Sequence, residues 1–202
     1  MKRLSFILLF SFISAIMTFG ANISELKNKA EQGNAEAQYS LGVCYRCGDG
    51  VEKNLEEAIK WYRKAAEQGY AKAQYNLAVC YDSEYGVEKN VEEAVKWYRK
   101  SAEQGYARAQ HNLGICYYNA DGEIQNNVKA LAWVCAAHAN GDNGATKAIR
   151  IIRQKMTSAQ IEQSLKLAKN YANGIFDESK ESMQLQIFHY LDSAQQDNFI
   201  KF

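Results

Sequence analysis

The chain has 202 residues and contains no proline. Its 24 Lys and Arg residues nearly balance its 23 Asp and Glu residues, so the net charge at neutral pH is only +1. A near-neutral chain lacks the electrostatic footprint of a nucleic-acid-binding protein and gives no reason to propose a membrane-surface partner. The lack of proline removes the main helix breaker and favours an all-helical chain.

The first twenty residues differ in kind from the rest. A basic pair opens them, an apolar run covers residues 4–19, and small residues suit a signal-peptidase cleavage before Ala21. We expect residues 1–20 to be a signal peptide and the mature chain to be periplasmic or secreted, with no stable membrane anchor after cleavage. The mature chain keeps 22 Lys and Arg against 23 Asp and Glu, a net charge of −1. The alternative is an uncleaved anchor helix, because the run is close to the shortest that spans a bilayer.

A repeat of 36 residues organises the chain from residue 34 to residue 141. Ala30–Ala65 and Ala66–Ser101 are identical at 25 of 36 positions, and a weaker copy follows. A period of this length is typical of a solenoid, whose units bury their apolar faces only by stacking on their neighbours. Residues that recur at this spacing include Trp61, Trp97 and Trp133, and Cys44, Cys80 and Cys116.

Each unit reads as two helices joined by a turn that contains glycine. In the first unit the spacing predicts helices over residues 34–47 and 55–68, the second capped by Asn54. Short connections force the two helices to be antiparallel. The predicted fold is therefore an all-α solenoid of antiparallel helix pairs, a tetratricopeptide-like superhelix. The apolar face expected on the second helix consists of Ala58, Trp61, Tyr62 and Ala65.

The repeat resembles a known family. Its pattern begins Ala-Glu-Gln-Gly-x-Ala-x-Ala-Gln-x-x-Leu-Gly, continues with Tyr and Gly-Val, and ends Glu-Ala-x-x-Trp-Tyr-x-Lys-Ala. This pattern resembles the Sel-one-like repeat, a relative of the tetratricopeptide repeat, and it fits three times in register. The resemblance implies an exported bacterial protein whose first helices line a concave surface that binds a protein or peptide.

The expected organisation of the mature chain follows from the repeat. We predict an N-terminal capping helix over residues 21–33, three repeats over 34–141, and a degenerate repeat with a closing helix over 142–175. Thr157 and Gln160 form a capping box that opens the closing helix at Ser158. Residues 176–202 are either a capping helix for the array or a mobile interaction tail, and the sequence leaves both open.

Candidate binding positions are those that differ between units while the second helix stays nearly constant, together with Tyr39, Tyr75 and His111, which flank them. They share one face of the first helix, which in the resembling family is the inner groove. Its aromatic and amide side chains suit an extended peptide or a partner helix. The alternative is that these positions are solvated and drifted after duplication. The candidate binding residues are Tyr39, Lys72, Tyr75, Asn76, Asp82, Arg108, His111, Asn112 and Tyr118.

Five cysteines and three histidines are the residues that invite chemical roles. Equivalent cysteines in stacked units are expected about 9–10 Å apart, beyond the reach of a disulfide at roughly 7 Å, so we expect small buried residues. Cys44 and Cys47 spell an isolated C-x-x-C, and a Cys116–Cys135 bridge stays open. The histidines His111, His138 and His189 have no metal-binding spacing. We therefore predict no metal and no cofactor.

Catalysis is not indicated. Ser24 and Lys27 spell Ser-x-x-Lys, the nucleophile motif of β-lactamases, but neither Ser-Asp-Asn nor Lys-Thr-Gly accompanies it. Weak penicillin-hydrolysing activity is associated with a cysteine-rich branch of the resembling family, yet Ala65 and Gln74 stand where that branch pairs cysteines. The prediction is a non-enzymatic adaptor or regulator. The alternatives are a β-lactam or cell-wall-acting enzyme and a self-associating structural array.

Overall fold

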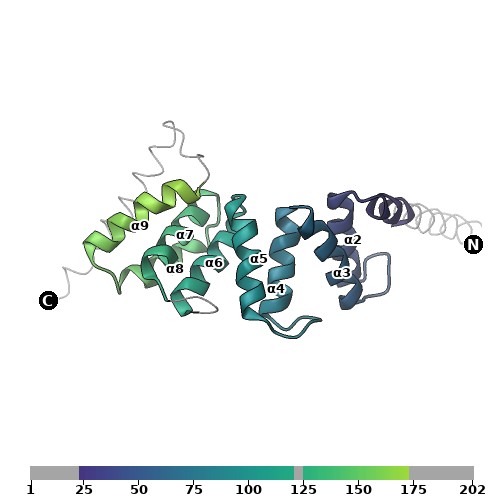
Figure 1. Ribbon diagram of the computed structural model, residues 1–202, viewed down its shortest axis with the longest axis horizontal. Helices are drawn as coiled ribbons and strands as arrows, with labels where there is room; N and C mark the ends of the chain where they lie inside the picture. The colour runs from purple at the N-terminus through teal and green to yellow at the C-terminus, as the bar shows by residue number, and fades with distance from the viewer. Residues whose placement is uncertain (1–22, 121–124, 173–202) are drawn as a thin grey trace, which may run out of the picture. The chain divides into compact units, whose positions relative to one another are not determined.

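The computed structural model describes residues 23–120 and 125–172, so the predicted signal peptide and the segment 176–202 lie outside the described residues. The regular structure of these residues is helical, which confirms the all-α prediction (Figure 1). None of the helices in the described ranges combines the length and apolar character needed to cross a membrane. After a helix over residues 23–31 come α2 (Ala35–Cys47), α3 (Leu55–Glu67), α4 (Ala71–Asp82), α5 (Val91–Glu103), α6 (Ala107–Asn119), α7 (Asn127–Ala139), α8 (Ala145–Arg153) and α9 (Ser158–Tyr171).

Asparagine caps set where several helices begin. The Asn34 side chain accepts a hydrogen bond from Ala37 N at 2.8 Å, so α2 begins one residue after the predicted start. Asn54 accepts from Glu57 N at 3.0 Å and begins α3 as predicted. These side chains satisfy amide groups that have no partner inside the helix. Equivalent caps at Asn90 and Asn126 begin α5 and α7.

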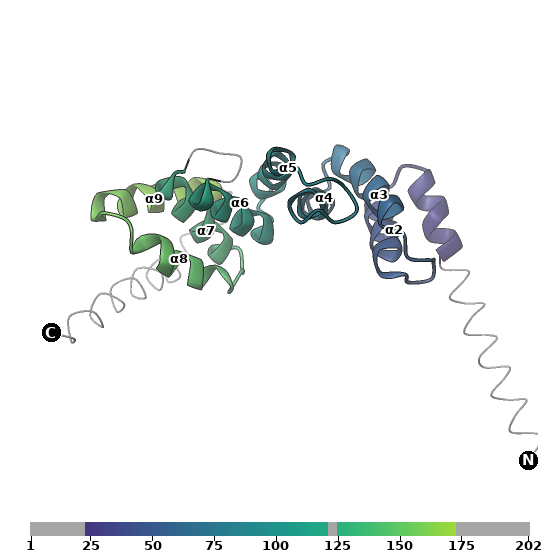
Figure 2. The ribbon, with the colours of Figure 1, turned by 90° about the horizontal axis from the view of Figure 1, so that it is seen from below.

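The chain divides into two compact units, residues 1–101 and 102–202, and each is described by itself. In the first unit α3 packs against both α2 and α4 (Figures 1 and 2). The predicted apolar face of α3 is confirmed, because all four of its residues are buried. Helices α2 and α3 approach so closely that a Cβ on Gly42 would come within 2.7 Å of the Tyr62 ring.

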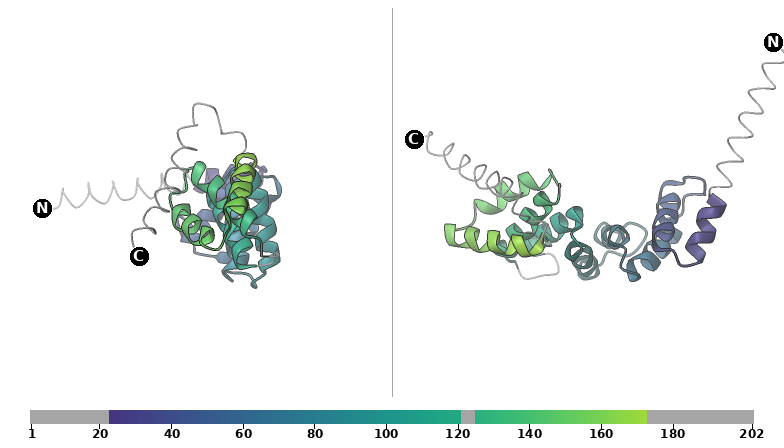
Figure 3. Two further views of the ribbon diagram at one scale, coloured as in Figure 1. Left: turned by 90° about the vertical axis from the view of Figure 1, so that its left-hand side faces the viewer. Right: turned by 90° about the horizontal axis from the view of Figure 1, so that it is seen from above.

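In the second unit α7 is the central helix. It packs against α6, α8 and α9 (Figures 2 and 3). Its residues Ala130–Ala137 are all buried. A Cβ on Gly114 of α6 would come within 2.5 Å of Val134 Cγ2, so only glycine permits this approach. Helix α9 begins with the predicted Thr157 capping box and lies on α7, where the rings of Trp133 and Tyr171 stack with centroids 3.9 Å apart.

A buried glutamine joins each of the first helices α2, α4 and α6 to the end of the preceding helix. Gln38 Nε2 donates to Ala30 O at 3.0 Å, and the equivalent Gln74 and Gln110 donate to carbonyls eight residues earlier, both at 3.1 Å. The last carbonyls of a helix have no partner within it. The repeated glutamine therefore satisfies a helix end and fixes the stacking of consecutive helices.

Candidate functional site

In the first unit the two candidate tyrosines are part of the helix packing. The Tyr39 ring lies 5.9 Å from the Tyr62 ring and 5.3 Å from the Tyr70 ring. The Tyr75 ring lies 6.0 Å from that of Tyr98. Both candidates are half-buried, so one part of each ring supports a neighbouring helix while the rest faces solvent. Lys72 is exposed on the surface of α4.

Asn76 and Asp82 lie beside the phenols of the second helices. Asp82 Oδ2 accepts a hydrogen bond from the Tyr98 hydroxyl at 3.2 Å. Burial raises the pKa of Tyr62 to about 12, although Arg46, the equivalent of Asp82, and Asn76 both act to lower the pKa. Arg46 and Asp82 occupy the same repeat position and differ in charge, yet each lies beside the equivalent tyrosine of a second helix. Some of the variation between units has a packing role.

The second unit contains a pocket between the first helices α6 and α8, with a volume of about 340 Å³. Two candidates, His111 and Tyr118, line it, whereas Arg108 is exposed and Asn112 half-buried outside it. Most of its wall was not predicted. The missed signal is a branched apolar residue that recurs every 36 positions, at Val43, Val79, Ile115 and Ile151. The pocket is lined by His111, Ile115, Tyr118, Asn119, Gly144, Lys147, Ala148, Ile151 and Ile152.

Polar groups stand at the edge of this pocket. His111 Nδ1 lies 2.7 Å from Asp142 Oδ2, and the side chains are 24% and 18% exposed. The other carboxylate oxygen, Asp142 Oδ1, accepts from Gly144 N at 2.9 Å. Lys155 Nζ lies 4.9 Å from the centre of the Tyr118 ring. Asp142 thus fixes the imidazole, while Lys147 and Lys155 add positive charge to an apolar cavity.

The pocket lining offers apolar walls together with an imidazole, a phenol and an ammonium group. Among the described residues that line the pocket, none is a serine, threonine or cysteine that His111 could activate as a nucleophile. Within the described part of the chain no group of three or more His, Cys, Asp or Glu residues could hold a metal ion. The Ser24 side chain is exposed, and Lys27 Nζ lies over the Tyr45 ring, 5.9 Å from its centre.

All five thiols are free. Cys80 and Cys116 are buried as predicted, but Cys44 is only half-buried, so the expectation for that position was too strong. Burial raises the pKa of Cys80 to about 11 and that of Cys135 to about 12, which keeps both thiols protonated and unreactive near neutral pH. The bridge between Cys116 and Cys135 that the sequence left open is not formed.

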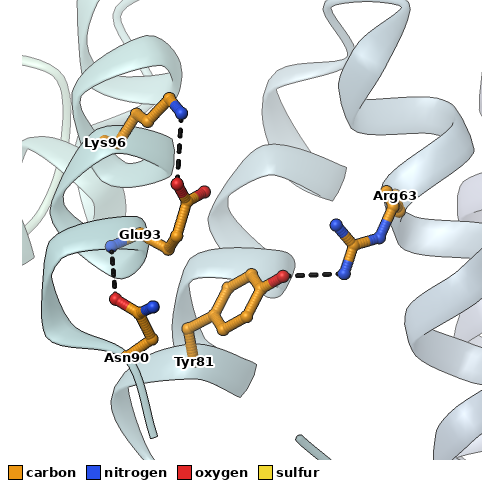
Figure 4. Close-up of polar contacts among 5 residues, drawn as sticks. All are labelled: Arg63, Tyr81, Asn90, Glu93 and Lys96. Carbon is orange, nitrogen blue, oxygen red and sulfur yellow. Dashed lines mark hydrogen bonds and ion pairs between the residues drawn. The ribbon is translucent and has the colours of Figure 1, made fainter. Parts of the chain in front are cut away.

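The constant charges of the second helices have structural partners. Arg63 Nη2 donates to the Tyr81 hydroxyl at 2.7 Å and joins α3 to α4 (Figure 4). Glu93 pairs with Lys96 at 3.1 Å within α5, as Glu57 does with Lys60 at 3.0 Å in α3 (Figure 4). These contacts give the low variation of the second helices a structural cause. The low variation of the second helices can therefore come from these contacts. It is weaker evidence that the variable first helices form a binding groove than the sequence suggested.

Two solved structures similar to this chain are described as a Sel1 repeat protein and as a protein with an SLR fold. One is a Sel1 repeat protein from Oxalobacter formigenes, with a TM-score of 0.66 and 36% identity, covering 80% of this chain and 68% of that one. Another is a protective antigen of uropathogenic Escherichia coli that displays an SLR fold. It has a TM-score of 0.60 and 32% identity, over 79% of this chain and 42% of the antigen.

Curated relatives match shorter stretches. The secretory immunoglobulin A-binding protein EsiB of Escherichia coli O6:H1 is 40% identical over 57 residues, which are 28% of this chain and 12% of that protein. The DAP3-binding cell death enhancer 1 of Rattus norvegicus is 33% identical over 61 residues, 27% of this chain and 12% of that protein. The chain therefore matches only a small part of the length of these relatives.

The family profile described as Sel1 repeat matches residues 35–70, 71–106 and 107–142, one match for each of the three repeats found by their period. Each match begins at the first residue of a first helix, α2, α4 or α6. The matched residues make up more than half of the chain, and two solved Sel1 repeat structures share its solenoid fold. The chain belongs to the Sel1 repeat family.

Proposed function

We propose that this protein is an exported adaptor or regulator that binds a segment of another protein along its first helices and catalyses nothing. Sel1 repeats are generally protein–protein interaction modules. Two relatives carry names that state binding to a protein, immunoglobulin A in one and DAP3 in the other. The proposal rests on the pocket between α6 and α8, because this pocket is a preformed cavity on the surface of two first helices.

The chemistry of the pocket indicates what it binds. Ile115, Ala148 and Ile151 supply apolar walls for a bulky side chain, and burying such a side chain contributes about 1.5–3 kcal/mol. Lys147 and the imidazole of His111 stand at the edge, where they can donate to a carboxylate or a backbone carbonyl. The expected ligand is a protein segment with a large apolar residue beside an acidic one.

Site-specific photo-crosslinking tests the proposal in the full chain. A photoreactive residue replaces Lys147, which is exposed and lines the pocket, and a matched probe replaces Lys96, an exposed lysine on α5. We expect the probe at 147 to crosslink a defined envelope protein that the probe at 96 does not capture, and mass spectrometry identifies it. Adding His111→Ala and Tyr118→Ala should weaken that product, with the helical circular dichroism unchanged.

Equal capture from both probe positions would mean that the binding surface lies outside the pocket. A crosslink only to copies of the same chain would favour the self-associating array. Loss of the product through unfolding is separated from loss of the site by the circular dichroism control.

A further inference from the structure

The pocket between α6 and α8 has an ionisable pair where the first two repeats have tyrosines. His111 stands two repeat periods after Tyr39, and Asp142 stands two periods after Tyr70. In the first repeat these two positions form an aromatic contact, with ring centroids 5.3 Å apart. In the third repeat they place His111 Nδ1 2.7 Å from Asp142 Oδ2. Because the repeat packs at this place without charge, packing alone does not explain the pair.

The contact with Asp142 determines which ring nitrogen of His111 carries the proton. An ionised carboxylate can only accept, so the neutral imidazole carries its hydrogen on Nδ1 and donates it to Asp142 Oδ2. Two further hydrogen bonds hold this carboxylate in place. Asp142 Oδ1 accepts from Gly144 N at 2.9 Å, and the backbone N of Asp142 donates to Ala137 O at 2.9 Å.

The second ring nitrogen, Nε2, is the polar atom that His111 offers to a bound molecule. In the stretches that the structure describes, Asp142 is the one hydrogen-bond partner of the ring, and the His111 side chain is 24% exposed. A Cβ on Gly144, which lines the pocket, would lie 3.8 Å from His111 Cε1, the carbon between the two nitrogens. Nε2 of the neutral ring can only accept a hydrogen bond, whereas both nitrogens of the charged ring donate.

The other ionisable groups around the pocket favour an anion. The lining residues, all within the described ranges, include no Asp or Glu. They include the Tyr118 phenol, and the buried stretch of α7 adds Cys135, whose pKa, raised to about 12 by burial, keeps the thiol protonated. The cations on these elements include Lys147 in the lining, Lys155 at 4.9 Å from the Tyr118 ring centre, and the exposed Arg108 on α6.

We propose that the pocket is a proton-linked carboxylate site, in which charged His111 donates Nε2–H to a carboxylate of the bound segment while Asp142 accepts the other ring N–H. Lys147 adds a second positive charge, and Ile115 and Ile151 contact the apolar side chain beside the carboxylate. This site rests on the proposed function of the pocket and adds the group that it recognises. Binding takes up one proton, so affinity rises as the pH falls, until the imidazole is already charged in the free chain.

Nitrogen-15 NMR of the full chain tests the ring without any added molecule. The imidazole signals of His111 are assigned by their loss in His111→Gln. In its neutral form the ring should carry hydrogen on Nδ1, and Asp142→Ala should shift the hydrogen towards Nε2. A wild-type neutral ring with hydrogen on Nε2 would overturn the proposal, because such a ring donates to a carboxylate without taking up a proton.

NMR titration with three short probes tests the recognised group, at pH 8 and pH 6, a range in which histidine titrates. Acetyl-Ala-Leu has a terminal carboxylate, acetyl-Leu-Glu-amide has one on a side chain, and acetyl-Leu-Gln-amide has none. At least one acidic probe should bind about tenfold more tightly at pH 6, and the neutral probe should change little. The acidic probe that responds identifies the source of the carboxylate.

Two variants separate the imidazole from the rest of the pocket. His111→Gln should remove the pH dependence, and His138→Gln, at the other histidine among the described residues, should keep it, with the helical circular dichroism of both unchanged. Equal binding of acidic and neutral probes, or affinity that does not change with pH, would overturn this site and leave the pocket as a protein-binding surface. Binding of no probe would also overturn it, whereas the crosslink at residue 147 tests the proposed function separately.

Discussion

At the scale of single residues, the buried glutamines show how the repeat holds itself together. Gln110 is fully buried and has three partners, since its Nε2 donates to Ala102 O and Tyr171 O and its Oε1 accepts from Asn140 Nδ2 at 2.8 Å. Gln38 has two, Ala30 O and the exposed side chain of Gln68. The same residue type at the same repeat position therefore carries a different number of contacts in the two units.

This difference predicts unequal costs for the same substitution. Gln110→Leu should lower the free energy of unfolding by about 2–4 kcal/mol, because a buried group that loses its partner costs about 1–3 kcal/mol. Gln38→Leu should cost about 1–2 kcal/mol, since Gln68 can turn to water. Urea unfolding followed by circular dichroism measures both. Equal costs would mean that the bonds to Asn140 and Tyr171 contribute nothing to stability.

At the scale of helices, the sequence predicted what depends on local pattern. The sequence predicted the period, the caps at Asn54 and Thr157 and the apolar face of α3, because each depends on residues that are close together in the chain. The structure confirms the two caps and the buried face. The pairing of His111 with Asp142 joins residues 31 positions apart in different parts of a repeat, and no local signal marks it. The wall of the pocket was missed because candidates were chosen for their variation between units, whereas the apolar position of Ile115 and Ile151 recurs in every unit.

The position of α9 also lies beyond local pattern. In the first two repeats a lysine covers the tryptophan of the second helix, with Lys64 Nζ 4.1 Å from the Trp61 ring centre and Lys100 Nζ 4.2 Å from that of Trp97. In the third repeat Ala136 stands at the lysine position. The face of Trp133 is thereby open to the Tyr171 ring, which stacks on it with an angle of 6° between the ring planes.

In the third repeat the ring of Tyr171, and not a lysine, covers the tryptophan. This stack predicts how strongly Tyr171 holds α9 on α7. Tyr171→Ala should lower the free energy of unfolding by about 3–5 kcal/mol, the range for large aromatic truncations in a core, with the half-buried site favouring the lower end. Tyr171→Phe keeps the ring stack and should cost much less. Lys64→Ala, at an exposed cation–ring contact, should cost about 0.5–1 kcal/mol. Thermal and urea unfolding compare the three, and similar losses for Ala and Phe would show that the stack does not hold α9.

At the scale of the whole molecule, the chain divides into two compact units after Ser101, inside α5. No glycine-rich linker or change of composition marks this point, and the two repeats before it share 25 of 36 residues. The repeat period also continues across this point into the third repeat, so the sequence indicated the order of repeats but not the division. In solenoids each repeat contacts only its neighbours, so stability is approximately a sum of local terms.

This locality predicts that a defect in one unit stays there. Gln110→Leu should speed hydrogen exchange in α6, α7 and α9, which its bonds join, while α2 and α3 in the first unit keep their wild-type protection. Gln38→Leu is the matched control and should show the opposite pattern, with faster exchange in α2 and α3 and little change in α7. Peptide-level exchange of both variants under native conditions gives the comparison. A uniform loss of protection in either variant would mean that the two units unfold as one cooperative body.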